Sequence, residues 1–230
     1  SLINDVNHTY TKPYFSSRLE YKLRRATFVL NLPLSLNYAT TNNREEKQEL
    51  TKVFLNPKLS FKYEFNNMFK INASGQYEQN IDNFENYYDN PVLSDYQSLF
   101  TMIAPMSVSD LTRANVRLTF NYPFYAINSS LSYTYQHRNS DIIYKYDIDE
   151  NGASYLQMIE SPNTSDYHVI NLNVKKFISV IKTTIGLKAN LLHNTRHNIL
   201  NGSLVENKNI SASIMPNMMV TIKHWAHFNY

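Results

Sequence analysis

The chain alternates apolar and polar side chains over stretches of about ten residues, and it repeats this pattern along its length. The clearest stretch, Ile181 to Leu191, reads Ile-Lys-Thr-Thr-Ile-Gly-Leu-Lys-Ala-Asn-Leu. Successive side chains of a β-strand point to opposite faces, so this stretch predicts a strand with one apolar and one polar face. About ten residues is also the length that a tilted strand needs to cross a bilayer.

The same period-2 alternation predicts about ten strands in all. They cover roughly residues 8–24, 26–40, 52–65, 68–80, 109–122, a sixth strand from about 126, a seventh ending near 176, then 181–191, 203–214 and 218–230. Pro33 lies inside the second strand and has no N–H to donate to a neighbour, so we expect a bulge or a weakly paired edge there.

Short and long connections alternate between these strands. The tight ones fall near residues 24–26, 66–67, 123–125, 176–180 and 216–217, and the long polar ones at 41–51, 80–110, 138–165 and 194–206. This alternation is typical of outer-membrane barrels, in which the turns face the periplasm and the loops face the medium. A soluble up-and-down barrel shares the alternation, but its inner face should be apolar. Here the apolar faces must point outward to lipid or inward against a second sheet.

Aromatic side chains gather toward both ends of the predicted strands. Those beside the tight turns are Phe65, Phe69, Phe120, Tyr122, Phe124, Tyr125 and Phe177, and those toward the long loops are Tyr38, Tyr77, Tyr133 and Tyr135. Two such bands resemble the interfacial girdles of membrane barrels, although aromatic residues are common in any strand.

The sixth and seventh strands are predicted to continue beyond the rest as one long hairpin. The segment Asp149-Glu-Asn-Gly-Ala153 supplies its turn, because Asn-Gly is the strongest short hairpin signal. Between Asp141 and Glu160 the alternation loses its separation into polar and apolar faces. We therefore expect this part of the hairpin to stand in water on both faces.

Composition narrows the class of protein further. The chain of 230 residues contains no apolar run long enough for a membrane helix, and its mean hydropathy is −0.44. A polar lumen face dilutes hydropathy in a membrane barrel, so this average is compatible with one. The net charge of +3 is too balanced to indicate nucleic acid as a partner, and the absence of cysteine excludes disulfides and thiolate metal sites.

No catalytic, cofactor or metal site is predicted. The chain has only four glycines and no Gly-rich phosphate loop, and His193 and His197 are predicted to lie in a surface loop rather than to hold a metal. The candidate for ligand contact is the loop at 80–110, whose aromatic faces and amides suit a sugar or a peptide. Its predicted contact residues are Asn86, Tyr87, Tyr88, Asn90 and Tyr96. The alternative is an ordinary exposed loop.

Three phrases carry a resemblance to a known family. They are Thr9-Tyr-Thr-Lys-Pro-Tyr-Phe, Leu32-Pro-Leu-Ser-Leu-Asn-Tyr and Leu55-Asn-Pro-Lys-Leu-Ser-Phe-Lys-Tyr-Glu-Phe. In style and order they resemble the barrel of TonB-dependent receptors from Bacteroidetes-type bacteria. The resemblance implies a 22-stranded barrel with an N-terminal plug in the bacterial outer membrane. Such a receptor is not an enzyme and takes up a large nutrient, such as a glycan, a peptide or a metal chelate.

The resemblance also implies partners. These are outer-membrane lipid, the inner-membrane TonB protein acting through a plug that residues 1–230 lack, and a surface lipoprotein. About ten strands are fewer than half of 22, so we expect an all-β, antiparallel, up-and-down transmembrane β-barrel portion of a larger barrel. Two alternatives stay open: a complete small outer-membrane barrel acting as an adhesin or surface enzyme, and a soluble β-sandwich or carbohydrate-binding module.

Overall fold

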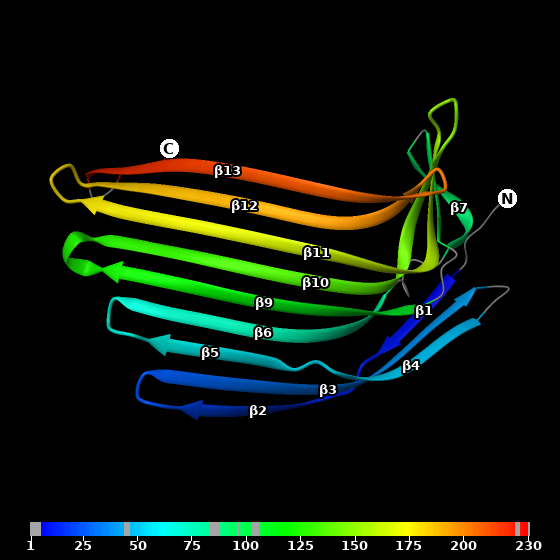
Figure 1. Ribbon diagram of the computed structural model, residues 1–230, viewed down its shortest axis with the longest axis horizontal. Helices are drawn as coiled ribbons and strands as arrows, with labels where there is room; N and C mark the ends of the chain where they lie inside the picture. The colour runs from blue at the N-terminus through cyan, green and yellow to red at the C-terminus, as the bar shows by residue number, and fades with distance from the viewer. Residues whose placement is uncertain are drawn as a thin grey trace.

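The protein is an all-β structure built on one large sheet (Figure 1). The computed structural model describes residues 6–43, 47–82, 88–95, 97–102, 106–223 and 226–229. Its strands are β1 (Val6–Thr11), β2 (Tyr14–Lys22), β3 (Ala26–Asn43), β4 (Lys47–Leu55), β5 (Lys58–Glu64), β6 (Phe69–Asp82), β7 (Tyr88–Asp95), β8 (Ser98–Met102), β9 (Ser107–Tyr122), β10 (Ile127–Ile148), β11 (Ser154–Ile178), β12 (Thr183–Leu200), β13 (Ser203–Lys223) and β14 (Ala226–Asn229). One 3₁₀ turn, η1 (Pro123–Tyr125), joins β9 to β10. None of the described segments is a helix long and apolar enough to span a membrane.

The main path of the sheet contains ten strands in the order β1-β3-β5-β6-β9-β10-β11-β12-β13-β14. The strands β2 and β4 also pair with β3: β2 continues the line of β1 on one side of it, and β4 continues the line of β5 on the other. The first eight predicted strands are found, whereas the ninth and the start of the tenth belong to the single strand β13, and β7 and β8 lie in a segment predicted as a loop. The sheet is not closed, because among the described residues no pairing joins the β1–β2 edge to β14. It is also not purely antiparallel: β8 runs parallel to β11, and a short piece of β10 runs parallel to β12.

Three prolines mark one line across the first strands of the sheet. Pro13 separates β1 from β2, Pro57 separates β4 from β5, and Pro33 lies opposite the second gap. Each proline carbonyl still accepts a backbone hydrogen bond from the adjoining strand, from the amides of Leu36, Asn56 and Tyr77 at 3.0–3.1 Å. The bulge or weakly paired edge predicted at Pro33 is found on one side only: Pro33 pairs with Ser16 in the uninterrupted β2–β3 ladder and lies opposite the gap between β4 and β5 on its other side.

Beyond this proline line the sheet divides. The outer part of β3 pairs with β1 and β4, whereas β6 continues along β9. The side chain of Asn56 bridges the division, donating to the carbonyl of Gln79 at 3.3 Å and accepting from its amide at 2.8 Å. We call the piece formed by β1, β4 and residues 36–43 of β3 the flap. A buried cluster of Ala39, Phe54 and Ile81 packs the flap against β6.

The predicted turn at residues 216–217 is wrong. β13 pairs with β12 without interruption from Thr183↔Val220 to Leu200↔Ser203, and Pro216 lies opposite Leu187 within that ladder. Among the described residues β14 pairs with β13 only from Met219 onward, so Pro216 lies where no described strand covers the second side of β13, and proline is tolerated there. The prediction of a long loop at 194–206 is also wrong, because residues 194–200 of β12 pair with residues 203–209 of β13.

The turn between β12 and β13 is instead the two-residue loop Asn201-Gly202. Both residues have positive φ, 46° and 79°, as a type I′ hairpin turn requires. Asn and Gly are the residues that adopt this conformation at least cost, and the sequence analysis overlooked the pair.

The long hairpin of β10 and β11 is confirmed, with its turn at residues 149–153. A register shift between Ser140 and Ile142 bends it, and Figure 1 shows the far ends of β10 and β11 leaving the plane of the sheet. Ile142 and Met158 form a small core there with Phe100 of β8. The turns that join β2 to β3, β5 to β6, β9 to β10 and β11 to β12 lie at one end of the sheet (Figure 1). The Asn201-Gly202 turn and the bent hairpin lie at the other end, which we call the rim.

Candidate functional site

Large apolar side chains are exposed on one face of the sheet, although some small polar side chains on the other face are buried. Leu131, Ile170 and Leu191 lie side by side on the apolar face and are about 40% exposed, at 43%, 40% and 43%. On the polar face Ser132 and Ser109 are buried, at 7% and 3%. No second sheet of the described strands covers the apolar face, since all of them belong to one sheet. A soluble domain would bury this apolar surface.

A continuous band of rings crosses the apolar face beside the tight turns. Phe28 packs on Phe61 with ring centroids 4.8 Å apart, and Phe65 lies 4.7 Å from Tyr63 and 5.1 Å from Phe69. The band continues through Phe120, Tyr122, Phe124 and Tyr125. Of the predicted group, Phe177 differs, because its register opposite Thr184 puts it on the polar face.

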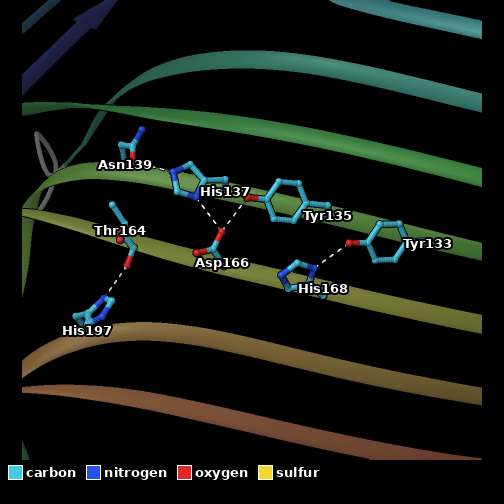
Figure 2. Close-up of polar contacts among 8 residues, drawn as sticks. All are labelled: Tyr133, Tyr135, His137, Asn139, Thr164, Asp166, His168 and His197. Carbon is cyan, nitrogen blue, oxygen red and sulfur yellow. Dashed lines mark hydrogen bonds and ion pairs between the residues drawn. The ribbon is translucent and has the colours of Figure 1, made fainter.

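A second band lies on the same face toward the rim (Figure 2). The ring of His168 lies 4.9 Å from that of Tyr135 and 5.7 Å from that of His193, and the hydroxyl of Tyr133 is 2.9 Å from His168 Nδ1. The prediction that His193 lies in a loop is wrong, since it belongs to β12, as does His197. The sequence predicts the two tyrosines of this band but not the two histidines. His168 and His193 come from other strands, and only the register of β10, β11 and β12 places them beside the tyrosines.

Polar groups follow this second band toward the rim. Asp166 Oδ1 lies 2.8 Å from His137 Nδ1 and accepts a hydrogen bond from the Tyr135 hydroxyl at 2.9 Å, and His137 Nε2 is 3.0 Å from Asn139 Oδ1 (Figure 2). The apolar face thus passes from aliphatic to aromatic to charged side chains within a few residues. Among the described residues no group of three or more His, Asp or Glu could hold a metal ion.

The polar face carries a row of hydrogen-bonding side chains across its middle. Arg117, Ser132, Asn171, Asn190 and Ser213 are direct register partners on five neighbouring strands. Asn190 donates to Asn171 Oδ1 at 2.7 Å, and the row lines a shallow groove of about 530 Å³. We call this hollow the wall groove. It offers amides, hydroxyls and positive charge to a polar solute.

A second hollow on the polar face lies at the rim, beneath the bent hairpin. It has a volume of about 240 Å³ and is lined by Asp82, Arg138, Ser140, Ile142, Tyr144, Asn163, Thr164, Ser165, Asn194, Arg196 and His197. An adjoining hollow of about 320 Å³ shares Tyr144, Arg196 and His197 with it and adds Tyr146, Asn198 and Asn207. We call the two together the rim pocket. Partial burial raises the pKa of Tyr144 above its usual value, so its hydroxyl keeps its proton into more alkaline solution than that of an exposed tyrosine.

The predicted ligand-contact residues are not among those that the structure describes in side-chain detail. Asn86, Tyr87 and Tyr96 lie outside the described residues, and Tyr88 and Asn90 are described only as backbone of β7. The rim pocket was missed because its residues come from segments predicted as loops. Comparisons with protein-family models, with curated proteins and with solved structures find no match to this chain.

Proposed function

We propose that this chain forms part of the wall of a β-barrel in the bacterial outer membrane, within a transporter of the TonB-dependent receptor class. The observation that carries the proposal is the exposed apolar face bounded by two aromatic bands. Exposing apolar side chains carries a free-energy cost in water but not in the hydrocarbon region of a bilayer. Aromatic girdles at both interfaces are a property of outer-membrane barrels. The open edges of the sheet fit a larger barrel completed by further strands.

The spacing of the two bands supports the same proposal. On β10, Ile127 pairs with Tyr122 of one band, and Tyr135 of the other band follows eight residues later. Eight residues of strand span about 26 Å, or roughly 20 Å along the membrane normal for a strand tilted by about 40°. The apolar band of such barrels is about 25 Å tall.

In this proposal the chain has no enzymatic role. Its polar face lines the lumen, with the wall groove at mid-height and the rim pocket at the outer mouth. The partners are membrane lipid, an energy-coupling TonB protein acting through a plug, and a surface lipoprotein. The cargo is a large nutrient.

Epitope tags test the membrane orientation of the full-length protein. A tag inserted after Asn151, in the turn of the bent hairpin, should bind antibody on intact cells. The matched tag after Asn67, between β5 and β6, should bind antibody only after the outer membrane is permeabilised. Equal labelling of the two tags on intact cells, or labelling of neither, would reject the barrel.

Growth tests the transport role. Deleting the gene of the full-length protein should abolish growth on one nutrient from a panel of glycans, peptides and metal chelates supplied as sole source. Deleting the gene of the energy-coupling protein should abolish growth on the same nutrient, because transport of this class draws its energy from the inner membrane. A deletion that impairs surface adhesion and leaves growth on every nutrient intact would favour an adhesin instead.

A further inference from the structure

Two arginines of the rim pocket lie in one row of the polar face. Arg138 of β10 is the register partner of Ser165 of β11, and Ser165 is the partner of Arg196 of β12. Residues opposite one another in a ladder point to the same face, so both arginines face the lumen side. Their backbones are two strand spacings apart, about 10 Å, with a serine between them.

The charges of the two arginines are not equally balanced. Arg138 donates to Asp82 Oδ2 at 2.6 Å and to Ser109 Oγ at 3.5 Å, and the Asp82 side chain is only 17% exposed. Arg196 has no carboxylate partner among the described residues, although it lines both hollows of the pocket. The pocket therefore holds one uncompensated guanidinium, which offers a planar fork of donors to a carboxylate.

A buried acceptor lies in the same pocket. Asn163 Nδ2 donates to the carbonyls of Ile142 at 3.5 Å and His197 at 3.3 Å, which fixes the amide, while its Oδ1 is buried and accepts no hydrogen bond. A buried oxygen without a donor is unfavourable, so a ligand group that donates a hydrogen bond to it gains binding free energy.

From these two groups we infer that the rim pocket binds a hydroxylated carboxylate, such as a uronic acid, free or as the end of a larger ligand. Arg196 binds the carboxylate, and a ligand hydroxyl donates to Asn163 Oδ1. Tyr144 and Tyr146, from the bent hairpin, present rings to the body of the ligand. The inference rests on the proposed function in one respect, since the rim opens to the medium only if the apolar face lies in lipid.

Calorimetric titration of the full-length protein in detergent micelles tests the site with four probes. Glucuronate carries both groups, cyclohexanecarboxylate carries the carboxylate alone, glucose carries hydroxyls alone, and sulfate is a bare anion. Glucuronate should bind most tightly. Arg196→Gln should weaken it about 10–100-fold, the range for a hydrogen bond to a charged group.

The control is Arg18→Gln, which removes an equal charge from the same face, where Arg18 pairs with Glu20 far from the rim. It should leave glucuronate binding unchanged. Binding of glucose or sulfate as tight as that of glucuronate, or an Arg196→Gln protein that binds glucuronate normally, would overturn the inference. If the unaltered protein does not bind glucuronate but keeps the two-tag labelling pattern, the pocket alone is rejected. If the labelling pattern is not observed, the barrel is rejected.

Discussion

Replacing Leu131 by arginine is expected to make folding into a bilayer less favourable by about 2–4 kcal/mol, the cost of Arg on the lipid face at mid-depth. Leu131 lies four residues from Ile127, which pairs with one aromatic band, and four residues from Tyr135 of the other. Its side chain is 43% exposed and therefore meets the surrounding solvent or lipid directly. In water the same substitution would relieve an exposed apolar group and cost little.

The matched control is Asn171→Arg on the polar face, one row away on the neighbouring strand. Asn171 is exposed and faces the wall groove, where an added arginine remains in water, so its effect should be within about 0.5 kcal/mol. Urea titration of folding into lipid vesicles, carried out on the full-length protein, measures both values. If the two arginines cost the same, the apolar face does not lie in lipid.

Phe54→Ala is expected to cost about 3–5 kcal/mol, the usual range for a buried phenylalanine. Phe54 is 2% exposed and joins Ala39 of β3 to Ile81 of β6, with Leu50, Met106 and Val108 packed around them. Since the flap has left the ladder of β6 beyond the proline line, this cluster replaces the missing backbone pairing. Truncation leaves a cavity where the flap packs against β6.

Val53→Ala provides the comparison for this prediction. Val53 is the preceding residue of β4 and is 63% exposed. Its replacement by alanine removes two methyl groups without opening a buried cavity. Protection of backbone amides against hydrogen exchange should fall in Lys47–Leu55 for Phe54→Ala and stay near the native level for Val53→Ala. Equal loss of protection in the two variants would mean that the cluster does not hold the flap.

The strands could be predicted because their signal is local. Alternation within a segment such as Ile181–Leu191 depends only on side chains two residues apart, and the Asn151-Gly152 turn depends on two adjacent residues. The turn predicted at 216–217 is wrong because Pro216 pairs within the β12–β13 ladder, on a strand whose other side no described strand covers at that point. The competing signal, Asn201-Gly202, lay inside a segment already assigned as loop.

The rim pocket could not be predicted in the same way. Arg138, Ser165 and Arg196 are far apart in sequence, and only the register of three strands brings them into one row. Register depends on turns whose position must be known to a single residue, since a slip of one moves every side chain to the other face. The bend at Ser140–Ile142, which brings Tyr144 over the row, lies where the alternation loses its separation into polar and apolar faces, but that loss gives neither the bend nor the register beyond it.

The proline line gives this sheet a seam. Along it Pro13, Pro33 and Pro57 contribute carbonyls but no N–H groups, so the strands are joined there by fewer hydrogen bonds than above or below. The backbone is therefore held less tightly along this line than in the ladders on either side of it. In the barrel that we propose, the least tightly bonded line of the sheet would separate the flap at the outer mouth from the strands that lie in lipid.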